Sequence, residues 1–214
     1  MNQFDIQLFV MPGCAICPQM EHLFSRMLHE GEITSLEIID VTEHEELAQQ
    51  HNIRSVPFYL INGIGFTGAR STDEIRVLLK QDQISNWKET LVQALSQGEL
   101  DTAEKAISEN EAARDAMIGL LKATDTALVV RIGLTAVIES FADQEWMLDY
   151  QDHIIDMTDH ADQRIAVDAL YYLSLIASSG SLDHLECVAT NSNGELSEHA
   201  RELLLDAKEG QVVH

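Results

Sequence analysis

Hydrophobic and polar positions follow two different patterns in the two parts of the chain. Up to about residue 82, short apolar runs alternate with helical spacing. Residues 6–10 and 36–41 form apolar runs that are long enough for a buried strand and too short for a helix. A third run begins at Pro57 and turns at Asn62-Gly63 into residues 64–67. Asn-Gly between two apolar runs is a strong signal for a β-hairpin.

Apolar residues spaced three and four apart lie between these runs and after them. The first helical pattern follows Pro12-Gly13 and runs to Gly31, through Met20, Leu23, Phe24, Met27 and Leu28. A short polar helix is expected over residues 43–51, and a last helix is expected after the capping residues Ser71 or Thr72. The order β-α-β-α-β-β-α predicts an α/β domain, a small mixed sheet covered by helices.

The second part of the chain has helical spacing throughout. Residues 120–125 match residues 154–159, and Arg131 matches Arg164 at an offset of 33. Each unit is expected to be a helix, a turn with an aspartate and a second helix, and stacked units cover each other's apolar faces. A weaker third copy at residues 197–200 lacks the aspartate and the arginine, and residues 87–107 predict an additional helical pair at the start.

This pattern resembles HEAT-like repeats of the short bacterial type over residues 112–208. Arg131 and Arg164 occupy equivalent repeat positions, which favours a structural role at the turns over a functional one. All three prolines and two of the three cysteines lie in the first 60 residues. We therefore expect two domains, an α/β domain over residues 1–82 and an all-α repeat domain over residues 83–214.

Charge and composition exclude several classes of function. The 214 residues include 13 Lys and Arg against 36 Asp and Glu, a formal net charge of −23. Such a surface repels phosphate backbones and anionic lipid, so we expect no nucleic-acid partner and no membrane partner. The sequence contains no run of 18 apolar residues, so no membrane helix is predicted. The N-terminal residues lack the pattern of a signal peptide. Three cysteines indicate a reducing compartment, and a cytoplasmic location is expected.

Cys14 and Cys17 form a Cys-x-x-Cys pair, which can be half of a metal site or a redox-active pair. Zinc needs two further ligands, and His22 and His29 on the following helix form no ligand pair. A cluster shared between two chains stays open as a minor alternative. The pair follows an expected strand and opens an expected helix, where backbone N–H groups and the helix dipole favour a thiolate. Redox chemistry is therefore favoured, and no metal site is predicted.

The third cysteine, Cys187, aligns with Leu120 and Ile154 on the apolar faces of the repeat helices. A buried structural thiol is therefore expected there.

Residues 4–80 resemble the thioredoxin superfamily, in particular its glutaredoxin-like and small archaeal and bacterial branch. The matching features are the strand at residues 6–10, the segment 12–18 (PGCAICP), Asp40-Val41, residues 54–57 (RSVP), the Asn62-Gly63 hairpin and the segment 66–68. The resemblance implies that Cys14 attacks a substrate disulfide and that Cys17 resolves the mixed disulfide. It implies that Val56 and Pro57 form a cis-proline loop whose backbone pairs with substrate, with Gly13 and Gly68 beside it.

The sequence departs from the thioredoxin pattern at three places around the cysteines. Gly13 stands where thioredoxins usually have Trp, and Leu8 stands where they usually have a buried Asp. The inner dipeptide is Ala15-Ile16. The expected function is a thiol-disulfide oxidoreductase for protein disulfides that needs no cofactor beyond an external dithiol or reductase, with the helical repeats as a partner-binding surface. The alternative is a non-catalytic scaffold that retains a thioredoxin-like module.

Overall fold

The computed structural model describes residues 4–191 and 194–211, and it divides the chain into two compact units, Met1–Thr90 and Leu91–His214. We describe each unit by itself. The helix that contains the division, α4 (Gln83–Ser96), contributes residues to both units. The domain boundary after residue 82 stays a prediction.

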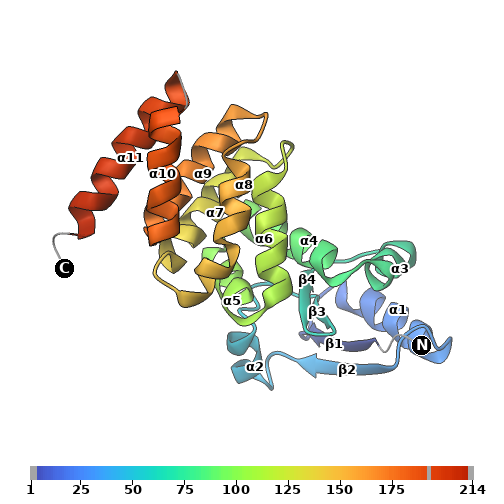
Figure 1. Ribbon diagram of the computed structural model, residues 1–214. Helices are drawn as coiled ribbons and strands as arrows, with labels where there is room; N and C mark the ends of the chain where they lie inside the picture. The colour runs from blue at the N-terminus through green and yellow to red at the C-terminus, as the bar shows by residue number, and fades with distance from the viewer. Residues whose placement is uncertain (1–3, 192–193, 212–214) are drawn as a thin grey trace. The chain divides into compact units, whose positions relative to one another are not determined.

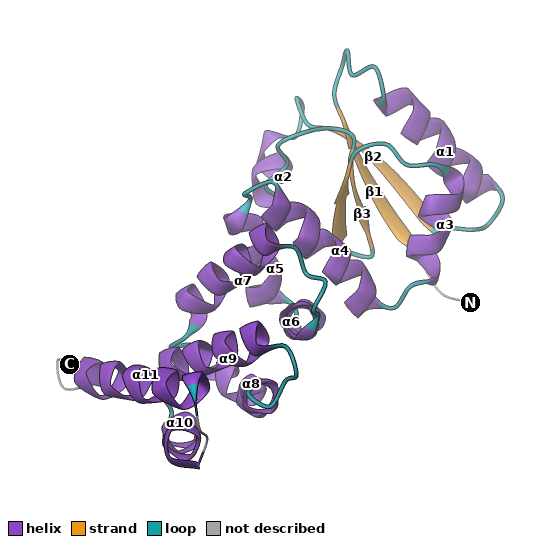
Figure 2. Cartoon of the chain, turned by 90° about the horizontal axis from the view of Figure 1, so that it is seen from above, coloured by secondary structure: helices purple, strands orange, loops and turns teal. Residues whose placement is uncertain are grey.

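The first unit is a four-stranded mixed sheet with helices on both faces (Figures 1 and 2). Its strands, in the spatial order β2-β1-β3-β4, are β1 (Asp5–Val10), β2 (Ser35–Asp40), β3 (Phe58–Ile61) and β4 (Ile64–Thr67). Strands β1 and β2 are parallel, and the other two pairs are antiparallel. The helices are α1 (Cys17–His29), α2 (Glu45–Gln50) and α3 (Thr72–Lys80). The predicted order β-α-β-α-β-β-α and the α/β class are confirmed.

The two faces of the sheet form two separate parts of the core. Helices α1 and α3 lie over one face and α2 lies on the other side, as Figure 2 shows. Under α1, the ring of Tyr59 packs against Phe24 with 5.2 Å between ring centroids. On the α2 side, Phe9, Ile39 and Leu60 form a smaller cluster. Strand side chains alternate between faces, so β1 contributes Leu8 to the first face and Phe9 to the second.

Two turns in this unit follow their sequence signals. Asn62 and Gly63 have φ of 49° and 86°, and positive φ at both central residues is what a tight type I′ hairpin requires. Ser71 caps α3, because its Oγ accepts a hydrogen bond from the Glu74 N–H while the Glu74 carboxylate accepts one from the Ser71 N–H. This capping box fixes the start of α3 one residue after the serine.

The prediction of a buried run over residues 36–41 was wrong for most of its length. Ile39 is buried, whereas Ile38 is 46% exposed. The reason is that β2 is an edge strand with a neighbour on one side alone, so α1 and α3 do not cover it fully. Leu28, expected on the buried stripe of α1, is also exposed.

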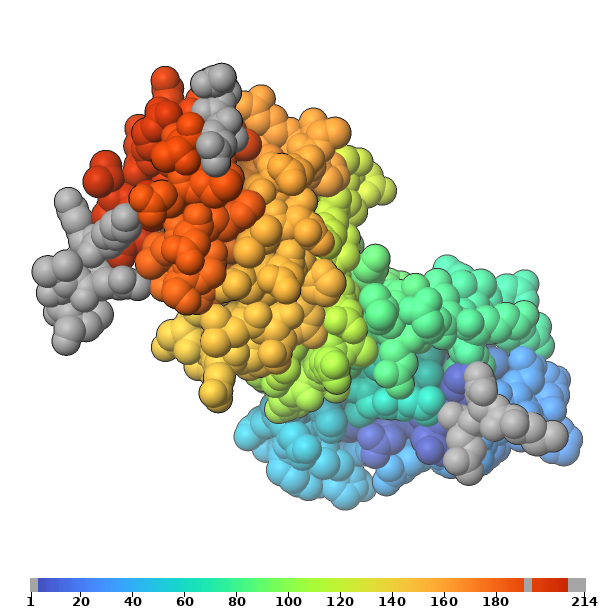
Figure 3. Space-filling view, in the orientation of Figure 1, coloured from blue at the N-terminus to red at the C-terminus, as the bar shows by residue number. Residues whose placement is uncertain are grey.

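The second unit is all-α, as predicted. After α4 come α5 (Leu100–Glu109), α6 (Glu111–Lys122), α7 (Leu128–Phe141), the 3₁₀ helix η1 (Glu145–Tyr150), α8 (Gln151–Met157), α9 (Gln163–Ile176), α10 (Ser179–Asn191) and α11 (Glu195–Gln211). The pairs α6/α7, α8/α9 and α10/α11 stack as helical repeats. On the face seen in Figure 3, the side chains of α6, α8 and α10 form one continuous surface. None of the helices within residues 4–191 and 194–211 is long and apolar enough to cross a membrane.

The spatial register of the repeats differs from the register in the sequence. Helix α7 buries Val130, Leu134, Val137 and Ile138, and α9 buries Ile165, Ala169, Tyr172 and Leu173. These two sets correspond at an offset of 35, two residues more than the offset of 33 that aligns Arg131 with Arg164. The two arginines therefore lie at different places on their helices.

The consequence is a different role for each arginine. Arg131 is buried, donates hydrogen bonds to the Leu121 and Ala123 carbonyl oxygens at 3.3 and 3.5 Å, and pairs with Asp168 at 2.5 Å. Arg131 thus supplies a donor to carbonyl oxygens at the end of α6 and links α7 to α9 through its ion pair. Arg164 is exposed and pairs at 2.7 Å with Asp162, the N-cap of its own helix.

The prediction of a buried Cys187 was wrong, because this thiol is exposed. The buried face of α10 contains Ser181, Leu185 and Val188, so Val188 occupies the core position that the sequence alignment gave to Cys187.

Candidate functional site

Cys14 and Cys17 lie at the start of α1 and are joined by a disulfide, with 5.5 Å between their Cα atoms. Strand β1 ends at Val10, and a turn in which the Cys14 N–H donates to the Met11 carbonyl leads into the helix. The two cysteines differ in access. Cys17 is 2% exposed, whereas Cys14 is partly exposed. A partner molecule can therefore reach Cys14 more easily than Cys17.

The start of α1 stabilises negative charge on the Cys14 sulfur. Its N-cap residue, Ile16, has no side chain that can accept a hydrogen bond, and the first turn contains no acidic residue. Instead, the Cys17 N–H donates to the Cys14 sulfur at 3.1 Å. This sulfur takes the place of a capping oxygen and lies at the positive end of the dipole of a 13-residue helix. When the disulfide is reduced, both contributions favour a thiolate at Cys14.

A loop that ends at Pro57 faces the disulfide. The Val56–Pro57 peptide bond is cis, and the Val56 carbonyl oxygen lies 3.9 Å from the Cys14 sulfur. The Gly68 N–H donates to the Pro57 carbonyl at 2.8 Å. Gly68 thereby ties the end of β4 to this loop. Its φ of +87° is a conformation that residues with a side chain rarely adopt.

Gly13 lies beside Cys14, is exposed and has a φ of +81°. No heavy atom would lie within 4 Å of a Cβ at this position, so the backbone conformation and not the available space requires glycine. The structure thus brings Gly13, Cys14 and Cys17 together at the start of α1, with Val56 opposite Cys14 and Gly68 hydrogen-bonded to Pro57.

The sheet face under α1 is apolar. Leu8, at the position of the usual buried aspartate, is fully buried and pairs across the sheet with Tyr59. The Tyr59 hydroxyl is buried and has no hydrogen-bond partner among the described residues. Burial raises the pKa of Tyr59, so this phenol stays protonated at neutral pH. Neither Leu8 nor Tyr59 supplies a base for the cysteines.

Two apolar residues next to the cysteines were not proposed as site residues from the sequence. Met11 and Ile16, on either side of Cys14 in the chain, are exposed although both are large and apolar. Their position within the segment that contains both cysteines was the available signal, because exposed apolar side chains that lie together mark a candidate interaction surface. Together with Val56 they give the surroundings of Cys14 an apolar character.

Among residues 4–191 and 194–211, no group of three or more His, Cys, Asp and Glu side chains could hold a metal ion. His22 and His29 are both exposed on α1.

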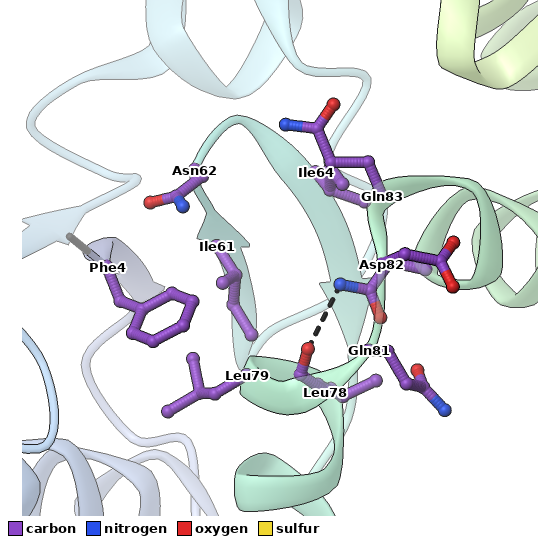
Figure 4. A pocket seen from close by; sticks show the side chains of 10 residues that line it. Phe4, Ile61, Asn62, Ile64, Leu78, Leu79, Gln81, Asp82 and Gln83 are labelled. Carbon is purple, nitrogen blue, oxygen red and sulfur yellow. Dashed lines mark hydrogen bonds between the residues drawn. The ribbon is translucent and has the colours of Figure 1, made fainter. Parts of the chain in front are cut away.

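A separate pocket of about 320 Å³ lies between the β3–β4 turn and the residues that join α3 to α4 (Figure 4). Ile61, Leu78 and Leu79 line its apolar side, and Asn86 donates a hydrogen bond from its side-chain amide to the Leu78 carbonyl at 3.1 Å. The neighbouring Asn62 accepts a hydrogen bond from the N–H at the start of β1, whereas the cysteines follow the end of that strand. The pocket therefore lies at the other end of the sheet from the disulfide.

Comparisons with known proteins agree with this geometry. Residues 4–80 match the family model of the thioredoxin domain. A thioredoxin of Methanocaldococcus jannaschii is 29% identical over 83 residues, which are 38% of this chain and 98% of that protein. The chain thus consists of a thioredoxin-like N-terminal domain fused to helical repeats. The resemblance found in the sequence is confirmed, and it extends over the part of the chain that contains Cys14, Cys17 and Pro57.

Proposed function

We propose that this protein is a thiol-disulfide oxidoreductase that acts on protein disulfides through Cys14 and Cys17, and that its helical repeats bind protein partners. One observation carries the catalytic part: a partly exposed sulfur at a helix N-terminus faces a proline loop, with its partner sulfur buried beside it. A thioredoxin-like domain supports the same class of chemistry. The fused helical unit would supply a surface beyond that of the small domain.

The reaction begins with the reduced pair. The Cys14 thiolate attacks one sulfur of the substrate disulfide, forms a mixed disulfide and releases the other substrate sulfur as a thiolate. Cys17 then loses its proton and attacks the Cys14 sulfur. The second substrate sulfur leaves as a thiolate, and the Cys17 proton together with one proton from solvent neutralises the two products. Two electrons have moved from the protein to the substrate. An external dithiol or a reductase returns them, and a cytoplasmic location would supply such donors.

Val56, Pro57, Gly13 and Gly68 are proposed to hold the substrate around Cys14. The backbone of Val56 would pair with an extended substrate segment, because the edge of a polypeptide strand offers N–H and C=O groups to another chain. Gly68 would keep this loop in place through its bond to the Pro57 carbonyl. Gly13 would leave room for substrate next to the attacked sulfur, because it has no side chain.

The test compares two variants, Cys17→Ser and Cys14→Ser, both in a Cys187→Ser background, because the exposed Cys187 would form mixed disulfides of its own. Cys17→Ser should accumulate mixed disulfides between Cys14 and partner proteins, detected as thiol-sensitive species on non-reducing gels. Cys14→Ser should form none and should lose disulfide reduction while its circular dichroism spectrum stays unchanged. A non-catalytic scaffold would give partners that are bound non-covalently in both variants. Equal turnover in Cys14→Ser and the wild type would refute the proposed chemistry.

A further inference from the structure

An apolar face is exposed at the start of α7. Leu128, Val129 and Ile132 are 73%, 51% and 62% exposed. Residues 128 and 132 are one helical turn apart, so they lie on the same side of the helix, and Val129 lies beside them. We call these three residues the α7 face.

The repeat architecture does not require apolar side chains at these positions. At the offset of 35 that matches the buried residues of α7 and α9, the corresponding positions of α9 are Gln163, Arg164 and Val167. Gln163 and Arg164 are polar and exposed, and Val167 is partly buried. The same place in the stack is thus compatible with polar side chains, and three exposed aliphatic residues at one place are typical of an interaction surface.

The charge of this unit indicates what kind of molecule would cover the α7 face. Leu91–His214 contains 23 Asp and Glu against 7 Lys and Arg, a net charge of −16. Much of the positive charge of this unit already interacts with acceptor groups within the protein. Arg131 and Arg164 are ion-paired, and Arg114 and Arg201 donate to backbone carbonyls. In the chain, the acidic residue Asp125 precedes Leu128 by three residues, and Glu139 follows further along α7.

A second copy of the chain is a poor occupant for this surface, because two units with a charge of −16 repel each other. We propose that the α7 face binds an amphipathic segment of a partner protein that carries aliphatic side chains on one side and lysine or arginine around them. This proposal rests on the proposed function in one respect: the partner is a disulfide substrate. The partner segment is basic and apolar, and the acidic unit is electrostatically complementary to it.

The binding test uses a synthetic helical peptide of leucines at helical spacing with lysines between them, labelled for fluorescence anisotropy, and the full-length oxidised protein. The Leu–Lys peptide should bind, whereas the same peptide with glutamate in place of lysine should not. Ile132→Asp should weaken binding by about tenfold or more, because burial of one isoleucine contributes at least that factor. Leu148→Asp is the matched control. Leu148 is 50% exposed in the same unit but lies outside the α7 face.

Three results would overturn the proposal: no binding of the Leu–Lys peptide, equal binding of the Glu peptide, or equal weakening by Leu148→Asp and Ile132→Asp. A wild type that sediments as a dimer and an Ile132→Asp variant that sediments as a monomer would also overturn it, since the α7 face would then cover itself. Circular dichroism of both variants checks that the helices remain folded.

A separate readout distinguishes this proposal from the proposed function. Reduction of a small-molecule disulfide by the reduced protein should be unchanged in Ile132→Asp, whereas reduction of a disulfide attached to the Leu–Lys segment should slow. If the reduced wild-type protein reduces neither disulfide, the redox function is refuted. The anisotropy results would still decide whether the α7 face binds a basic segment.

Discussion

Arg131 and Arg164 provide a sharp test of the packing argument, because the sequence makes them equivalent and the structure does not. In Arg131→Ala, two carbonyl oxygens at the end of α6 lose their donor, and Asp168 loses its ion pair. Net contributions of about 0.5–1.5 kcal/mol for each hydrogen bond, and about 3–5 kcal/mol for breaking a buried ion pair, bound the effect. Asp168 keeps 36% of its side-chain surface exposed, so solvent screens the ion pair and its contribution falls below the buried range, to about 1–2 kcal/mol. Together with the two hydrogen bonds, this gives a total of about 3 kcal/mol.

Urea unfolding followed by far-UV circular dichroism measures this effect, because most of the helix belongs to the repeat unit. With a slope of about 1–3 kcal/mol per molar urea, a loss of about 3 kcal/mol lowers the midpoint by roughly 1–3 M. Arg164→Ala should leave the midpoint almost unchanged, since an exposed pair within one helix end contributes little. Asp168→Asn should fall between the two. Equal shifts in Arg131→Ala and Arg164→Ala would refute the reasoning from burial.

Three further predictions concern packing, capping and thiol access. Gly133→Ala should destabilise the repeat unit by about 1 kcal/mol, because a Cβ would lie 2.9 Å from Leu95 Cδ2 and this overpacking outweighs the gain in helix propensity; a higher thermal midpoint would contradict it. Ser71→Ala should cost about 0.5–2 kcal/mol in a denaturant titration through the lost cap of α3. The hydrogen bonds from Ser71 lower the pKa of Glu74 below 4.5, so this carboxylate stabilises the fold above that pH and the contribution is lost on acidification. The wild type should therefore lose more stability than Ser71→Ala below pH 4.5, and parallel pH profiles would argue against the capping box. The oxidised native protein should react with one equivalent of a thiol reagent at the exposed Cys187, and Cys187→Ser should not react; a thiol that reacts only after unfolding would contradict this exposure.

Local signals in the sequence were sufficient to predict the order of the helices and strands of the first unit. Asn62-Gly63 predicted the hairpin because a tight turn needs positive φ at both central residues. Ser71 or Thr72 predicted the start of α3, and Ser71 is the cap because its hydroxyl accepts a hydrogen bond from a backbone N–H that the helix leaves unpaired. The position of the Cys-x-x-Cys pair after a strand and before a helix predicted the polarised surroundings of Cys14. Each of these features depends on residues close together in the chain, so the sequence alone determined them.

Burial and the partners of single side chains depended on the tertiary structure. Ile38 is exposed because β2 is the edge strand, and strand order is not encoded in the local pattern of β2 itself. Cys187 is exposed because Val188 takes the core position of α10, a shift of one residue that rotates a helical position by about 100°. The approach of the Val56 carbonyl to the Cys14 sulfur joins residues 42 positions apart. The sequence determined which segments are strands and helices and where the cysteines lie in them, because those preferences are local. Only packing between distant segments decided which faces are covered, since that choice depends on neighbours that the local pattern does not contain.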